Sequence, residues 1–183
     1  MKPENVLIDA KGFLRITDFG LSKSNVKGLK DAFSVCGTPE YLAPEVLLKK
    51  GHGKPVDWWS FGCFLYEMLS GLPPFYTQTR EELFEKIKFD PPKLPSKLST
   101  SAKDLINALL NKDPEQRLGS GPLGAKEIKS HPWFSGVDWA AYLKMEVKPP
   151  FVPKIKGELD VSNFDPVVIS EVSFTECNTL GIY

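Results

Sequence analysis

Residues 54–70 read KPVDWWSFGCFLYEMLS, and this stretch decides the fold. Within residues 58–69 the one charged side chain is Glu67, and large apolar side chains fall on every face of a helix drawn through the segment. A helix that is apolar all round is buried in a protein core. The segment therefore predicts a central buried helix, with Asp57 placed to favour the helix dipole near its start and Gly71 placed to end it.

Two short runs of β-forming residues, Val6–Asp9 and Phe13–Ile16, precede this helix. Gly12 lies between them and can adopt the positive φ that a tight turn needs, so the two runs predict a β-hairpin. The segment Leu21–Gly37 is polar, small and aperiodic, with little that could join a core. It predicts a long surface loop.

Further helices are expected after residue 70. An amphipathic helix is predicted at Arg80–Phe89, a second from the hydroxyl-bearing residues 99–101 to Asp113-Pro114, and a last short one at Ala125–Ser130. From about Lys148 onward, prolines among isolated apolar residues predict an extended tail. The expected fold class is α+β, mainly helical, with a small N-terminal β-hairpin and an extended tail.

Composition narrows the class of protein. The 183 residues hold 23 Lys and Arg against 23 Asp and Glu, so no global field favours nucleic acid or an anionic membrane as a partner. The cysteines Cys36, Cys63 and Cys177 are widely spaced and form no metal-binding pattern, which favours a reducing compartment. No apolar run resembles a signal peptide or approaches the roughly 20 residues that cross a bilayer, so we expect no transmembrane segment and a cytoplasmic or nuclear location.

Two short motifs flank the predicted hairpin, Lys2-Pro3-Glu4-Asn5 before it and Asp18-Phe19-Gly20 after it. The hairpin would bring Asn5 and Asp18 side by side at the ends of paired strands. Mg²⁺ takes few protein oxygens and leaves its other positions to phosphate and water, so these side chains with Lys2 could hold a metal–nucleotide triphosphate. Each motif alone is more often an ordinary surface turn, and the inference rests on their combination.

Four further motifs follow in order along the chain: Gly37-Thr38-Pro39-Glu40-Tyr41-Leu42-Ala43-Pro44-Glu45, Asp57-Trp58-Trp59-Ser60-Phe61-Gly62, Asp113-Pro114-Glu115-Gln116-Arg117-Leu118-Gly119 and His131-Pro132-Trp133-Phe134. With these motifs the chain resembles eukaryotic protein kinases, and in particular the AGC group near protein kinase B and the serum/glucocorticoid-regulated kinases. The resemblance implies a protein kinase-like fold, with the C-terminal lobe at residues 1–134 and an AGC C-terminal tail at residues 135–183.

The resemblance also implies roles for individual residues. Asn5 and Asp18 match the family's magnesium ligands, and Lys2 matches the lysine that contacts the γ-phosphate of ATP and the substrate hydroxyl. Thr38 matches the threonine that steadies the catalytic aspartate. Ser34 stands where an upstream activating kinase places the activating phosphate.

Other implied roles concern shape and substrate. Three residues match structural positions: Glu45 and Arg117 as a buried ion pair, and Asp57 as an acceptor of backbone hydrogen bonds from the catalytic loop. Glu4 and Glu67 match acidic positions that read an arginine before the phosphorylated residue, although both could be ordinary exposed charges. Phe164 in the tail matches a residue near the adenine pocket. The family's terminal hydrophobic motif is not found, and residues 172–176 are a poor substitute.

Several catalytic parts of the kinase template are not in this sequence. They are the catalytic aspartate, which the template places just before Met1, the glycine-rich loop, the strand lysine and the helix glutamate. We therefore expect the 183 residues alone to be inactive and to expose an apolar face that a small lobe or another chain would cover. One interpretation is part of an ATP-dependent Ser/Thr kinase of basic-motif proteins, and the alternative is a non-catalytic binding module or decoy.

Overall fold

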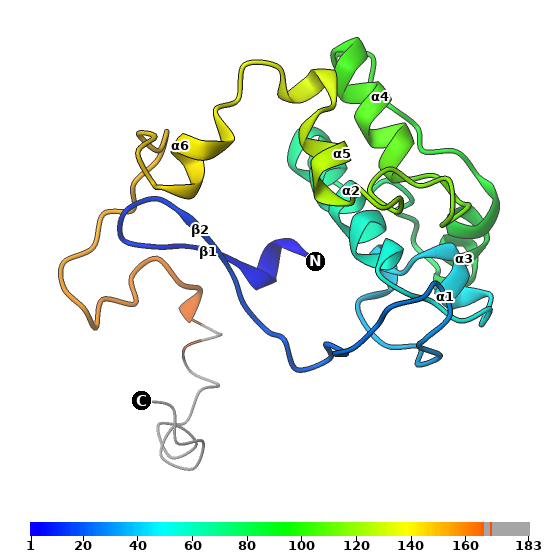
Figure 1. Ribbon diagram of the computed structural model, residues 1–183. Helices are drawn as coiled ribbons and strands as arrows, with labels where there is room; N and C mark the ends of the chain where they lie inside the picture. The colour runs from blue at the N-terminus through cyan, green and yellow to red at the C-terminus, as the bar shows by residue number, and fades with distance from the viewer. Residues whose placement is uncertain (167–168, 170–183) are drawn as a thin grey trace. The chain divides into compact units, whose positions relative to one another are not determined.

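The computed structural model describes residues 1–166 and residue 169 (Figure 1). The chain forms two compact units, which are described separately. The first consists of Met1–Val6 and Ile16–Trp139, and the second of Leu7–Arg15 and the chain from Ala140 onward. None of the helices in the described part of the chain is long and apolar enough to span a membrane.

Helix α2, Pro55–Ser70, is the centre of the first unit, and the sequence predicted its bounds to within one residue. Trp59 and Cys63 are fully buried, and Gly71 ends the helix in the left-handed conformation with φ 92°. The helix is not buried on every face, because Met68 in its last turn is 56% exposed. The expectation of an all-round buried helix is therefore wrong for that turn.

Helix α4, Thr100–Leu109, packs directly against α2. Gly62 makes this packing close, since a Cβ atom there would lie 2.9 Å from the Cβ of Leu109. Ser99 caps α4 as predicted, by accepting a hydrogen bond from the backbone N–H of Ala102. The helix ends at Leu109, four residues before the Asp113-Pro114 pair that was expected to end it.

The remaining helical elements surround this pair. The predicted amphipathic helix is confirmed as α3, with Leu83 and Ile87 buried. The short helix expected at Ala125–Ser130 is α5, but it is not the last, because η3 and α6 follow it. The bounds of these elements are η1 Pro3–Asn5, η2 Pro39–Tyr41, α1 Pro44–Leu47, α3 Arg80–Phe89, α5 Ala125–Lys129, η3 Pro132–Phe134 and α6 Trp139–Leu143.

The predicted loop at 21–37 has neither helix nor strand, and most of its residues are exposed. Ala32 is an exception, because it is 3% exposed and forms an isolated antiparallel β-bridge with His52. A small side chain at this position lets the loop backbone approach residues 51–53. The expectation that little in the loop joins the core therefore agrees with the structure, in which Ala32 is the buried residue among these exposed ones.

The predicted hairpin is confirmed as β1, Val6–Ile8, paired with β2, Leu14–Ile16. Gly12 takes φ 91° in the turn between the strands, as the sequence predicted. Within the second unit, the tail passes close to this turn, since a Cβ on Gly12 would lie 2.4 Å from the carbonyl oxygen of Phe151. Residues 172–176 and Cys177 lie outside the described residues.

Candidate active site

The two predicted metal ligands lie next to each other. Asn5 ends η1 and Asp18 follows β2, and the backbone N–H of Thr17 donates to the carbonyl oxygen of Asn5 at 2.9 Å. The Asn5 amide Nδ2 then reaches Asp18 Oδ2 at 3.3 Å. The pairing predicted from the flanking hairpin is therefore what brings the side chains together.

Asp18 has an unusual backbone conformation for a residue other than glycine, with φ 59°. Aspartate tolerates the left-handed region better than most side chains, and here its Oδ1 accepts a hydrogen bond from Gly20 N at 3.4 Å. This conformation turns the carboxylate toward Asn5.

The donor set fits magnesium bound together with a nucleotide. One amide and one carboxylate are hard oxygen donors, and Mg²⁺ in nucleotide sites takes one or two protein oxygens with phosphate and water. Among the described residues no cluster of three or more His, Cys, Asp or Glu could hold a metal. Asn5 and Asp18 thus suit a metal that arrives with phosphate better than a metal enclosed by protein.

Lys2 and Thr38 occupy the positions directly before two short helices. Lys2 precedes η1 and Thr38 precedes η2, and both residues are half-buried. Within the described part of the chain neither the Lys2 ammonium nor the Thr38 hydroxyl makes a hydrogen bond inside the protein. Their catalytic roles stay predictions.

Tyr41 in η2 contacts an acidic side chain of α2. The Tyr41 hydroxyl donates a short hydrogen bond to Glu67 Oε2, and Glu67 is half-buried on α2. Burial, the Glu67 hydrogen bond and the nearby charges of Glu67 and Glu4 raise the pKa of Tyr41. One of the two acidic residues predicted to read an arginine, Glu67, therefore binds a tyrosine hydroxyl that the sequence interpretation did not single out.

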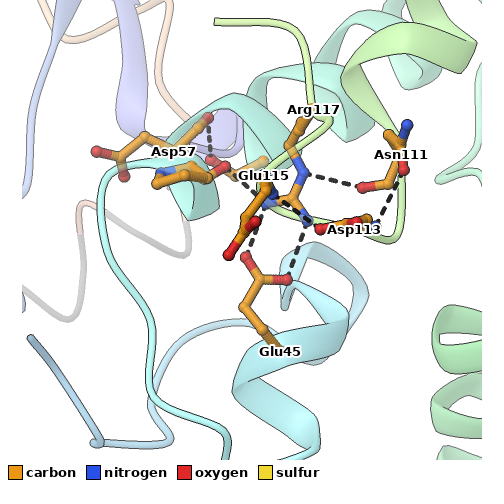
Figure 2. A network of polar contacts seen from close by, with 8 residues as sticks. Glu45, Asp57, Asn111, Asp113, Glu115 and Arg117 are labelled. Carbon is orange, nitrogen blue, oxygen red and sulfur yellow. Dashed lines mark hydrogen bonds and ion pairs between the residues drawn. The ribbon is translucent and has the colours of Figure 1, made fainter. Parts of the chain in front are cut away.

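Figure 2 shows the ion pair between Glu45 and Arg117, which joins α1 to the chain beyond α4. Arg117 binds both carboxylate oxygens of Glu45, at 2.7 and 2.9 Å, and donates to the carbonyl oxygens of Pro55 at 2.8 Å and Asn111 at 3.0 Å. Its guanidinium carbon also lies 5.2 Å from the centre of the Trp59 ring. Arg117 and Glu45 are only 2% and 5% exposed, so every polar group of this buried pair needs the partner it has.

The predicted structural role of Asp57 stays a prediction. In the described residues no backbone N–H donates to its carboxylate, although the kinase template led us to expect such bonds. Asp57 is exposed as a residue, yet desolvation of its carboxyl group raises its pKa, against the charges of the terminal amine and His52.

Two predicted sites remain at the surface. Ser34 is exposed in the 21–37 loop, and Phe164 in the second unit is 49% exposed. Within residues 1–166 neither side chain makes a hydrogen bond or an ion pair. Their roles stay predictions.

Lys112 is a half-buried cation that the sequence interpretation missed. Its ammonium donates to the carbonyl oxygen of Ile87 at 2.6 Å, at the C-terminal end of α3, and lies 4.0 Å from the centre of the Phe75 ring. Burial lowers the pKa of Lys112 to about 8. The only sequence signal is its place directly before Asp113-Pro114, which gives no hint of contacts with α3.

The helical body with its two-stranded sheet agrees with the protein kinase-like fold that the motifs implied. The protein kinase domain family matches residues 1–134, and the chain belongs to this family. The resemblance to AGC-group Ser/Thr kinases that the motifs indicated is also confirmed by the relatives of this chain.

Three similar proteins illustrate this. Serine/threonine-protein kinase gad8 of Schizosaccharomyces pombe is 48% identical over 172 residues, covering 94% of this chain and 30% of its own length. Serine/threonine-protein kinase sgk-1 of Caenorhabditis elegans is 48% identical over 163 residues, covering 89% of this chain and 35% of its own length. A RAC family serine/threonine-protein kinase homolog of Dictyostelium discoideum is 47% identical over 172 residues, covering 93% of this chain and 38% of its own length. The chain therefore spans about a third of the length of these relatives.

Proposed function

We propose that this chain carries the large-lobe share of an ATP-dependent serine/threonine protein kinase that phosphorylates proteins within arginine-containing basic motifs. The observation that carries this proposal is the contact between Asn5 and Asp18 at 3.3 Å, which sets two hard oxygen ligands beside each other. We assign residues 1–134 to the C-terminal lobe and residues 135–183 to the AGC tail. The proposed location is cytoplasmic or nuclear.

Asn5 and Asp18 would hold Mg²⁺ bound to ATP, and the metal, when bound, supplies positive charge to the phosphates. Lys2 adds a protein charge on the side of η1 and would stabilise the negative charge that develops on the transferred phosphoryl group. Thr38, directly before η2, would hold the catalytic aspartate that the kinase template supplies from outside these residues.

Glu4 and Glu67 would provide the basic-motif preference. An arginine guanidinium pairs with a carboxylate through two directional hydrogen bonds, which makes it a specific ligand for such a pair. Glu67 already accepts the Tyr41 hydroxyl, and this bond orients its carboxylate toward the end of η2. Tyr41 is thus a positioning residue for substrate recognition in this proposal.

We further propose that the 183 residues alone do not transfer phosphate. They do not contain the catalytic aspartate or the parts of the kinase template that grip the α- and β-phosphates. Phosphoryl transfer depends on positioning and charge stabilisation, so loss of these parts removes nearly all of the rate.

The test compares two preparations in one assay with Mg²⁺-ATP and an arginine-containing serine peptide. The first is the purified 183-residue chain, for which we expect no transfer. The second is the endogenous protein, tagged at its genomic locus and characterised by intact mass, for which we expect transfer that Asp18→Ala abolishes and Glu81→Ala, an exposed control on α3, leaves intact. Transfer by the 183-residue chain that depends on Asp18 would overturn the proposed inactivity.

The second candidate function is a non-catalytic binding module or decoy for substrates or for an upstream activating kinase. The exposure of Phe19 at 65% and Leu21 at 71% favours it, because large apolar side chains at the surface suit a partner such as a small lobe or another chain. An endogenous protein of 20.4 kDa without transfer activity would support this function over the first.

A further inference from the structure

Lys112 lies where the end of α3 meets two aromatic side chains. Its ammonium nitrogen donates to the carbonyl oxygens of Lys86 at 3.3 Å and Ile87 at 2.6 Å, near the C-terminal end of α3. The nitrogen also lies 4.0 Å from the centre of the Phe75 ring and 5.0 Å from the centre of the Trp59 ring. These contacts hold the nitrogen in one place, on a side chain that is half-buried.

The hydrogen bonds of this nitrogen suit a neutral amine as well as an ammonium ion. An ammonium ion has three N–H groups, whereas an amine has two N–H groups and a lone pair. The two carbonyl oxygens of α3 can accept both N–H groups of the amine, and no third group among the described residues forms a hydrogen bond with the nitrogen. The lone pair of the amine is therefore not used within the part of the chain that the structure describes.

Burial of Lys112 also favours its neutral form, since it lowers the pKa to about 8. The charge of Arg117 acts in the same direction, whereas Cys63 on α2 and Asp90 after α3 act against it. At about pH 7, roughly a tenth of such side chains are free amines, against fewer than roughly one in a thousand for a lysine with the ordinary pKa of about 10.4. The free amine is the nucleophilic form of lysine.

Lys112 is one of the residues that line a cavity of about 450 Å³. This volume is near the lower end of the range for small-molecule sites, so the cavity suits a compact compound. Lys30 and Lys50 line the same cavity and are exposed, and neither forms a hydrogen bond or an ion pair with the other described residues. Their two ammonium groups are therefore free to pair with an anion.

The other charged side chains of the lining have partners or oppose each other. Lys88 forms an ion pair with Glu85, and Glu45 is bound at both oxygens by Arg117. The remaining carboxylates of the lining are those of residues 113 and 115, and the first of these already accepts the backbone N–H of the second at 2.9 Å. The lining therefore offers an amine beside free cations.

We propose that Lys112 is a nucleophilic lysine that accepts the acyl group of a small acyl phosphate bound in this cavity. The lone pair of the nitrogen attacks the carbonyl carbon, an N–C bond forms, and the bond from that carbon to the phosphate oxygen breaks. Inorganic phosphate leaves with the bonding electrons, and the nitrogen gives up one proton to water. Lys30 and Lys50 pair with the phosphate through charge-assisted hydrogen bonds.

The acylated side chain would hold the end of α3 less firmly. The nitrogen of the resulting amide has one N–H group, so it can donate to only one of the two carbonyl oxygens of α3. The amide also carries no charge, so the cation–π attraction to Phe75 and Trp59 is lost. Acylation would thus loosen the last turn of α3, and this effect does not depend on the proposed kinase function.

The experiment treats the endogenous protein, tagged at its genomic locus, with acetyl phosphate at about pH 7 and follows acetylation of each lysine by mass spectrometry. We expect Lys112 to react about fivefold or more faster than Lys126, an exposed lysine of α5. In the same protein unfolded in guanidinium chloride, the two lysines should react at similar rates. Similar rates in the folded protein, or a ratio that unfolding leaves unchanged, would overturn the proposal.

Lys30→Gln with Lys50→Gln tests where the donor binds. This double change should slow acetylation of Lys112 by acetyl phosphate about threefold or more, and should affect its reaction with p-nitrophenyl acetate, a neutral acyl donor, much less. The matched control is Lys27→Gln with Lys54→Gln, which removes the same charge from the lining of another cavity. An equal decrease in the control, an equal decrease with the neutral donor, or no decrease at all would contradict an acyl phosphate site.

Discussion

The region around the Glu45–Arg117 pair and the region around Asn5 and Asp18 are held in opposite ways. Arg117 is buried and donates to one carboxylate and two carbonyl groups. Asp18 is exposed, and its carboxylate makes two long hydrogen bonds to other described residues, at 3.3 and 3.4 Å. The first region gains its order from this chain alone. The second leaves oxygen atoms free, which is what a ligand-binding region requires. Stability and candidate chemistry are thus carried by different residues.

The largest effect is expected from Arg117→Met. It leaves Glu45 as a buried, unpaired charge, so the free energy of unfolding should fall by about 3–5 kcal/mol, measured by urea denaturation. Adding Glu45→Gln to this variant should recover part of the loss, since the stranded charge is gone. A single-variant loss below about 1 kcal/mol would show that the pair is not the main support of the helical body.

Gly62→Ala should have the next largest effect. The new Cβ atom would lie 2.9 Å from Leu109 Cβ and 2.9 Å from Leu110 Cδ2, so α2 and α4 must separate slightly. We expect a loss of about 1–3 kcal/mol in the same denaturation measurement. Gly157→Ala, where a Cβ would meet nothing within 4 Å, is the control. Similar losses in both variants would contradict close packing at Gly62.

Tyr41→Phe should cost less, about 1 kcal/mol, because it removes one hydrogen bond to the half-buried Glu67. Tyr76→Phe removes a hydroxyl from a tyrosine that is 54% exposed and should be close to neutral. In the endogenous kinase Tyr41→Phe should also raise KM for an arginine-containing peptide more than for the same peptide with lysine. Unchanged KM values for both peptides would argue against a positioning role for Tyr41.

Asp18→Asn should have the smallest effect on stability, within about 0.5 kcal/mol, since its side chain is exposed and asparagine tolerates the left-handed backbone. The same variant should weaken Mg²⁺-dependent binding of ATP by the endogenous protein, measured by titration calorimetry. A large loss of stability would mean that the two regions are not separable in the way their contacts indicate.

The sequence predicted what local chemistry determines. The ends of α2, the Ser99 cap and the Gly12 turn follow from side-chain type within a few residues. The motif resemblance paired Glu45 with Arg117 across 72 positions, which hydrophobic periodicity alone could not do.

Contacts between distant, ordinary-looking residues were missed. The Ala32–His52 bridge and the Tyr41–Glu67 bond join positions whose side chains carry no local signal of a partner. The exposure of Met68 was missed because the sequence pattern of an apolar residue near a helix end does not show whether another segment packs over it.

The Ala32–His52 bridge also has a consequence for the entropy of the loop. Gly53 also approaches the carbonyl oxygen of Gly28 closely, since a Cβ on Gly53 would lie 2.1 Å from it. Together the two contacts divide the long loop at residues 21–37 into two shorter loops. Closing a loop costs conformational entropy, and this cost grows only slowly with the number of residues in the loop. A proteolytic cut within residues 21–27 would therefore open only the first loop and leave Ala32 paired with His52 and Phe33 beside Gly51.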